Sequence, residues 1–338
     1  MTGAAKPAGV LEAILAHKRE EIAALRARGP APDQGLTPRY FPLHSRQTAH
    51  RSGTAPSSAL PNPQNPHSLS LGRQTVYRLS SSNQQLERRE EKQHQAEDQG
   101  NRALAPHGSG FPGPSGGKPI AALGRAPLQL ICEIKRRSPS TGALDTTLGV
   151  AERAARYASA GADLLSVLTD ARSFGGSFDH LTEARRACEL PILCKEFILD
   201  PVQLEHAASA GADAVLLIVR CLGPALRSLH QAATALKLTP LVEVTTEAEA
   251  AQALAAGARW IGVNARDLDT LEIDLPRAER VLAALPPDIV TAQLSGLSTP
   301  EAVARVAQSR ADAALIGTAL MREADPAPLL RVLRAAAG

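Results

Sequence analysis

Residues 158–168 read ASAGADLLSVL, a run of small residues with a glycine followed by a short apolar stretch. Related stretches are ASAGADAVLLIV at 208–219, AAGARWIGV at 255–263 and SRADAALI at 309–316. In each copy we expect a helix to end, usually at a glycine, and a tight turn to lead into a strand. The chain therefore carries a degenerate internal repeat of helix, turn and strand.

Four further apolar runs, near residues 130, 193, 242 and 291, bring the predicted strands to eight. Their spacing of about 20 to 35 residues is typical of βα units, because parallel strands need helical crossovers. A doubly wound open sheet would carry a G-x-G-x-x-G loop after its first strand, whereas residues 135–140 read KRRSPS. We therefore predict an α/β fold, a (β/α)8 TIM barrel over residues 118–338.

Two different regions precede the predicted barrel. Residues 8–28 predict an amphipathic helix that ends at Gly29-Pro30, so that an N-terminal helical part spans residues 1–30. In that helix we assign Lys18, with the charged residues after it, to the solvent-facing side, opposite an apolar stripe of Val10, Leu11, Ile14, Leu15, Ile22 and Leu25. Residues 31–117 are rich in Ser, Pro, Gln, His and Arg without a persistent period, which predicts a low-complexity, disordered insert.

The composition argues against several classes of function. A net charge of +3 is too small to indicate nucleic acid or an acidic membrane surface, and 3% aromatic residues weaken a base-stacking role. The four cysteines lack the close pairing of a zinc site, and Cys132 and Cys194 fall inside apolar strands. We expect reduced thiols, a cytoplasmic protein, no metal, no signal peptide and no membrane span.

Polar residues stand where the predicted strands end. In residues 128–135, LQLICEIK, Glu133 and Lys135 are two apart and therefore point to the same side of the strand. The carboxyl ends of barrel strands converge on one mouth, where catalytic groups lie. The other strand ends supply Thr169 and Asp170, Lys195, the apolar pair Leu216 and Ile218, Glu243, Asn264, Ser295 with Gly296, and Gly317 with Thr318. One such charge alone would indicate a structural ion pair, but the series predicts an active site.

The chemistry of this set favours proton transfer on a phosphorylated small molecule. The last two loops, with Ser295, Gly296, Gly317 and Thr318, suit a phosphate held by backbone N–H groups. Two lysines and two carboxylates can donate and accept protons, and a Schiff-base lysine remains possible. No metal triad, Ser-His-Asp arrangement or cofactor fingerprint is found, so we expect no cofactor.

The motifs resemble one known family. Residues 132–140, CEIKRRSPS, resemble the E-x-K-x-x-S-P-S signature of indole-3-glycerol phosphate synthases. Residues 166–170 with 174–177, 193–197, 241–244 and 261–268 are similar to further motifs of that family. The resemblance covers residues 118–338, and residues 8–28 resemble the extra N-terminal helix that packs on the family's barrel.

The resemblance implies a carboxy-lyase of tryptophan biosynthesis that closes the ring of 1-(2-carboxyphenylamino)-1-deoxyribulose 5-phosphate. By position, Lys195 matches the general acid of ring closure and Lys135 a second lysine, near the substrate carboxylate or in dehydration. Glu243 matches the acid/base of dehydration, and Glu133 and Asn264 match groups that hold the substrate hydroxyls and the lysines. The substrate- and phosphate-binding matches are Arg137, Ser138, Ser295, Gly296, Gly317 and Thr318, with an apolar wall of Phe174, Phe197, Leu216 and Ile218. We expect Arg266 to brace the mouth by an ion pair.

Two features depart from the family pattern. Residues 291–296 read TAQLSG, which puts Leu294 where the family usually has a glutamate. The loss of a substrate-hydroxyl contact predicts reduced activity, unless a bulge lets Gln293 substitute in part. The segment 31–117 replaces a shorter segment that covers the substrate, which predicts a weakened lid.

Two alternatives stay open. A related barrel such as phosphoribosylanthranilate isomerase is disfavoured, because that enzyme would need an Asp/Cys acid-base pair. A barrel that binds the phosphorylated ligand with weakened or lost catalysis is motivated by Leu294 and the insert. We expect a monomer or a weak homodimer without a nucleic-acid or membrane partner.

Overall fold

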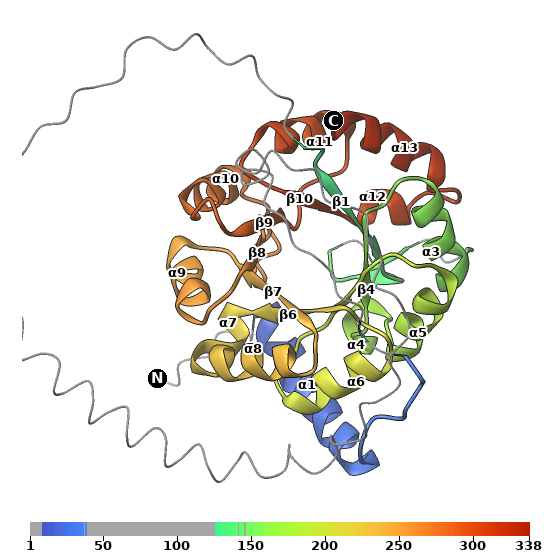
Figure 1. Ribbon diagram of the computed structural model, residues 1–338, viewed down its shortest axis with the longest axis vertical. Helices are drawn as coiled ribbons and strands as arrows, with labels where there is room; N and C mark the ends of the chain where they lie inside the picture. The colour runs from blue at the N-terminus through green and yellow to red at the C-terminus, as the bar shows by residue number, and fades with distance from the viewer. Residues whose placement is uncertain (1–8, 37, 39–125, 141, 145–146) are drawn as a thin grey trace, which may run out of the picture. The chain divides into compact units, whose positions relative to one another are not determined.

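The computed structural model describes residues 9–36, 38, 126–140, 142–144 and 147–338, and it forms a barrel ringed by helices (Figure 1). Eight parallel strands close in the order β1-β10-β9-β8-β7-β6-β5-β4. The strands are β1 (Gln129–Ile134), β4 (Leu164–Leu168), β5 (Ile192–Lys195), β6 (Ala214–Ile218), β7 (Thr239–Val244), β8 (Trp260–Val263), β9 (Val290–Gln293) and β10 (Ala313–Ile316). The predicted TIM barrel is thereby confirmed.

Helices follow the strands and pack around the outside of the barrel (Figure 1). They are α3 (Val150–Ser159), α4 (Ala171–Phe174), α5 (Phe178–Ala187), α6 (Pro201–Ser209), α7 (Val219–Leu222), the 3-10 helix η2 (Gly223–Ala225), α8 (Leu226–Ala235), α9 (Glu247–Ala255), α10 (Leu275–Ala284), α11 (Pro300–Gln308), α12 (Thr318–Met321) and α13 (Ala327–Ala336). A small antiparallel pair, β2 (Arg137–Ser138) and β3 (Gly142–Ala143), follows β1. Within the described residues, no helix is long and apolar enough to cross a membrane.

Alternate residues of each strand belong to two apolar layers. One cluster, with Leu130, Cys132 and Leu165, lies between the strands and the helices. The other, with Ile131 and Leu164, fills the inside of the barrel. The barrel is therefore a packed core rather than a pore.

The repeat glycines adopt the conformation that the sequence predicted. Gly161, Gly211 and Gly257 have φ values of +100°, +92° and +93°, a region that side chains with a Cβ rarely enter. Each follows a helix of the ring and directs the chain back towards the next strand.

The repeat aspartates have a role that the sequence did not disclose. Asp163 accepts the backbone N–H of Leu130, on a neighbouring strand, at 2.7 Å. In the same way, the Asp213 carboxylate accepts the N–H of Ile192 and the Asp312 carboxylate that of Thr291, both at 2.8 Å. An arginine pairs with each of them: Arg334 with Asp163, Arg185 with Asp213 and Arg310 with Asp312. Each aspartate thus ties the amino end of one strand to the turn before its neighbour.

The predicted N-terminal helix is present as α1 (Val10–Arg28) and lies beside α6, to which Arg26 is joined by an ion pair with Asp200. The assignment of Lys18 to its solvent-facing side is wrong. The Lys18 side chain is 1% exposed, because two carboxylates of the barrel surround it. The predicted insert 31–117 lies almost entirely outside the described residues, so its disorder stays a prediction.

The Arg185–Asp213 pair predicts a large loss of stability in Arg185→Met. Asp213 is fully buried, and removing the partner of a buried charge destabilises a protein by about 3–5 kcal/mol. Urea denaturation of the purified variants measures the change in the free energy of unfolding. The control is Arg259→Met, whose exposed pair with Asp288 contributes at most about 1 kcal/mol. Equal, small losses in both variants would contradict this account.

Candidate active site

A cavity of about 660 Å³ opens at the carboxyl ends of the strands. It brings together residues from every strand end and from the loops that follow. The predicted site residues that line it are Glu133, Lys135, Ser138, Phe174, Lys195, Phe197, Leu216, Ile218, Glu243, Asn264, Arg266, Ser295, Gly296, Gly317 and Thr318.

Arg137 is the predicted site residue that does not line the cavity. It belongs to β2, its side chain is exposed, and its guanidinium donates to the carbonyl of Ala171 at 2.9 Å. The pairing of β2 with β3 holds Ser138 inward, where it is buried, and leaves Arg137 outside.

Glu133 and Lys135 form a close ion pair at the end of β1. The Lys135 Nζ lies 2.6 Å from Glu133 Oε1, and both side chains are largely buried. Gly317, at the end of β10, packs against this pair: a Cβ there would lie 2.3 Å from Glu133 Oε1 and 3.0 Å from Lys135 Nζ. A side chain at position 317 would therefore displace the charged ends of this pair.

Lys195 faces Glu243 across the mouth, with 3.5 Å between Nζ and Oε2. Glu243 is 1% exposed, and its Oε1 accepts a hydrogen bond from the Asn264 amide at 2.9 Å. Its Oε2 makes no hydrogen bond within the described part of the chain. A buried carboxylate with one uncommitted oxygen beside an ammonium group can exchange a proton with a bound molecule.

Asn264 is held in turn by groups from β9 and from its own loop. The Ser295 hydroxyl donates to Asn264 Oδ1 at 2.6 Å, and the Arg266 N–H donates to the same oxygen at 3.0 Å. The Arg266 guanidinium donates to the carbonyl of Leu271 at 2.6 Å. Arg266 thus holds this loop through a backbone carbonyl, and the structure gives it no ion pair among the described residues, where the sequence analysis predicted one.

Small residues form the side of the cavity near β9 and β10. Gly296 has a φ of +84°, and Thr318 is the first residue of α12. Arg322, which the sequence did not single out, also lines the cavity here. The backbone can therefore come close to a bound anion at this side.

The opposite side of the cavity is apolar and extends beyond the predicted wall. The rings of Phe174 and Phe197 lie 6.4 Å apart between centroids. Leu11 and Ile14 of α1 line the cavity as well, as does Leu268 of the loop after β8. The apolar stripe of α1 predicted a buried face, but no signal in the sequence placed that face at the mouth.

Leu294 stands at the end of β9 with its side chain in the cavity. It is 4% exposed and covers Gly262, where a Cβ would lie 2.5 Å from Leu294 Cδ1. Gln293 points away from the cavity and donates to the Ser295 carbonyl at 3.1 Å. It pairs in register with Val263 and Ala314, so β9 has no bulge that brings Gln293 to the mouth.

No group of His, Cys, Asp and Glu among the described residues is arranged to hold a metal ion.

A sequence model of the family named indole-3-glycerol phosphate synthase matches residues 82–333. The chain belongs to the indole-3-glycerol phosphate synthase family. The match covers the whole described barrel and overlaps residues 82–117 of the predicted insert.

Similar proteins with this family name occur in several bacteria. The chain is 46% identical to indole-3-glycerol phosphate synthase 1 of Streptomyces coelicolor over 208 residues, which cover 61% of this chain and 77% of the relative. It is 45% identical to an indole-3-glycerol phosphate synthase of an Exiguobacterium species over 206 residues, which cover 61% of this chain and 81% of the relative. A solved 3-hexulose-6-phosphate synthase aligns with 62% of this chain and 100% of its own, at a TM-score of 0.51 and 19% identity. That structural likeness concerns the fold alone.

The packing of Gly317 predicts that Gly317→Ala destabilises this family member. The added methyl group displaces the buried Glu133–Lys135 pair, and such overpacking costs about 1–3 kcal/mol. Urea denaturation measures the loss. The control is Gly149→Ala, where a Cβ meets nothing within 4 Å and φ is −64°, so that only a weaker N-cap, below about 1 kcal/mol, is expected. A neutral Gly317→Ala would show that the pair is not held there.

Proposed function

We propose that this chain is a carboxy-lyase that converts 1-(2-carboxyphenylamino)-1-deoxyribulose 5-phosphate into indole-3-glycerol phosphate, carbon dioxide and water. Membership of the family supports the reaction. The observation that carries the assignment of roles is Lys195 facing the buried Glu243 beside an apolar wall. The proposal requires no cofactor and includes a cytoplasmic location and a monomer or weak homodimer.

In the first step the anthranilate ring lies against Phe174, Phe197, Leu216 and Ile218. Its carboxylate-bearing carbon attacks the ribulose carbonyl carbon, and the electron pair of the carbonyl moves to oxygen. Lys195 gives a proton to that oxygen, which becomes a hydroxyl. Loss of carbon dioxide then returns the bonding electrons to the ring and restores its aromaticity.

In the second step the new hydroxyl leaves as water. Glu243 removes a proton from the adjacent CH₂ carbon through its uncommitted oxygen, and a lysine supplies the proton that the leaving hydroxyl needs. We assign Lys135 either this role or that of holding the substrate carboxylate. Glu133 orients Lys135, and Asn264 orients Glu243.

The phosphate is proposed to bind at the side of the cavity formed by Ser295, Gly296, Gly317 and Thr318. Backbone N–H groups of small residues suit a phosphate, and Ser138 and Arg322 lie in the same cavity. Arg137 is left out of this set, because its guanidinium is committed to Ala171 outside the cavity.

Leu294 favours a second candidate, a barrel that binds the phosphorylated ligand but turns it over slowly or not at all. An apolar side chain at this strand end cannot accept a hydrogen bond from a substrate hydroxyl. The two candidates share the binding site and differ only in product formation, so one assay separates them.

The turnover assay compares wild-type protein with Lys195→Met. Wild type should form fluorescent indole product, and the variant should lose about 10²- to 10⁴-fold in kcat, because it lacks the general acid. Protection of both proteins against heat by the substrate serves as the binding control. Binding without product in the wild type would support the second candidate, and equal turnover in both would remove Lys195 from the mechanism.

Leu294→Glu tests the departure at β9. A restored carboxylate should raise kcat/KM about 10-fold or more, since a hydrogen bond to a charged group contributes about 1.5–3 kcal/mol. Leu294→Gln is the matched control, because glutamine has the shape of glutamate without its charge. If neither variant gains activity, Leu294 is not what limits this site.

A further inference from the structure

Lys18 stands in the middle of the apolar face of α1. Leu11, Ile14, Lys18 and Ile22 follow one another at intervals of three or four, so they lie on one side of the helix. The Lys18 side chain is 1% exposed, as buried as the leucine and isoleucine on either side of it. A charge in such a place requires partners, because burying it alone is costly.

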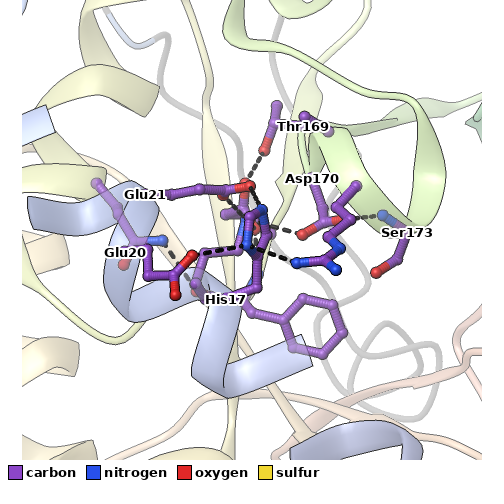
Figure 2. A network of polar contacts seen from close by, with 12 residues as sticks. His17, Glu20, Glu21, Thr169, Asp170 and Ser173 are labelled. Atoms are coloured by element: carbon purple, nitrogen blue, oxygen red, sulfur yellow. Dashed lines mark hydrogen bonds and ion pairs between the residues drawn. The ribbon is translucent and has the colours of Figure 1, made fainter. Parts of the chain in front are cut away.

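The partners of Lys18 are carboxylates at the ends of two neighbouring strands. Its Nζ lies 2.8 Å from Asp170 Oδ2, after β4, and 2.9 Å from Glu196 Oε1, after β5. Glu21 of α1 also pairs with it, and Figure 2 shows this network of polar contacts. Burial lowers the pKa of Lys18, but the charges of Glu196 and Asp170 outweigh that effect and raise it, so the ammonium form is retained.

Glu196 shapes the chain directly after Lys195. Its Oε1 accepts the backbone N–H of Phe197 at 2.7 Å, and its Oε2 accepts the Thr169 hydroxyl at 2.8 Å. Glu196 is 4% exposed. The orientation of this carboxylate therefore fixes the turn that carries Lys195 on one side and Phe197 on the other.

Asp170 shapes the corresponding turn after β4. Its Oδ1 accepts the backbone N–H of Ser173 at 2.7 Å, which caps the short helix α4 (Figure 2). Phe174 is the last residue of that helix and faces Phe197 in the cavity. Lys18 thus binds the two carboxylates that fix the turns of both aromatic residues.

We propose that Lys18 is a positioning residue, which holds the turns after β4 and β5 together and so sets the places of Lys195, Phe174 and Phe197. This inference rests on the proposed function for its effect on turnover. Its structural content, the clamp between Asp170 and Glu196, does not depend on which substrate the cavity takes.

Removal of the ammonium group leaves two buried carboxylates beside each other. Burial and the charge of Asp170 raise the pKa of Glu196, and the variant lacks the charge of Lys18 that lowers it. Below that raised pKa one of them is protonated and the turns can stay together. Above it both are charged and repel, so the variant should lose activity as the pH rises.

The other titratable groups near Lys18 belong to the edge of the same network. Glu21 also contacts His17, which lies near Glu20 and Arg172 (Figure 2). These groups are more exposed than Asp170 and Glu196. They remain in every variant described below, so a difference between the pH profiles reports on the buried carboxylates.

The experiment compares wild type, Lys18→Met, Arg19→Met and the double variant Lys18→Met with Glu196→Gln. At about pH 8, Lys18→Met should lose about 10- to 100-fold in kcat/KM, the effect of a displacement of about 1 Å at the site. The loss should shrink as the pH is lowered and Glu196 takes a proton. Arg19→Met removes an exposed cation one position along α1 and should retain the wild-type profile. The double variant removes the repulsion and should regain the wild-type shape of the pH profile.

Amide hydrogen exchange gives a readout that does not need turnover. Lys18→Met should lose protection at the Phe197 and Ser173 amides at high pH. The double variant should recover protection at Phe197, because the amide oxygen introduced by Glu196→Gln can still accept that N–H.

If Lys18→Met does not fold, the inference requires that the double variant fold and show the wild-type pH profile of kcat/KM. Unchanged pH profile and exchange in Lys18→Met, or a double variant that is not rescued, would overturn the inference. A wild type without product, but with this pattern of exchange, would overturn only the proposed function.

Discussion

The pairing of β1 with β10 is the constraint on which the rest of the molecule depends. Gln129 to Cys132 pair in register with Ala313 to Ile316, and this contact joins the first barrel strand to the last. Closure leaves no free edge in the sheet and points all eight carboxyl ends at one mouth. Residues that are far apart in the sequence, such as Glu133 and Gly317, come within van der Waals distance because of it.

A second constraint is that charges at a largely buried mouth must be compensated. Lys135 pairs with Glu133, Lys195 with Glu243, and Lys18 with Asp170 and Glu196. In each case a partner of opposite charge makes the burial of the charged group tolerable. The Glu243 oxygen that faces Lys195 makes no hydrogen bond within the described residues, and the amide of Asn264 holds the other oxygen.

The sequence predicted the barrel and the strand-end residues of the candidate site from local patterns, and the resemblance to the family added Ser138, Phe174, Phe197 and Arg266. Strand length, glycine turns and polar residues at strand ends are properties of short segments, and closure of the barrel then converts sequence order into proximity. Arg137 was placed in the site because it matches a phosphate contact of that family, but side-chain direction in the β2–β3 turn depends on pairing that the sequence does not state. Leu11 and Ile14 were predicted to be buried, yet which part of the barrel they cover depends on how α1 docks. The repeat aspartates went unexplained for the same reason, since their partners lie on a neighbouring strand.

Lys18 shows why a wrong prediction can be informative. As a lysine it was expected to face solvent, while its spacing from Leu11, Ile14 and Ile22 suggested burial. The spacing predicted its position correctly. The reason is that Asp170 and Glu196 are nearly as buried as Lys18 itself, so the barrel needs a cation that α1 supplies. Leaving a buried charge without its partner costs about 3–5 kcal/mol. The helix α1 therefore supplies a charge that the barrel needs and apolar side chains that line the cavity.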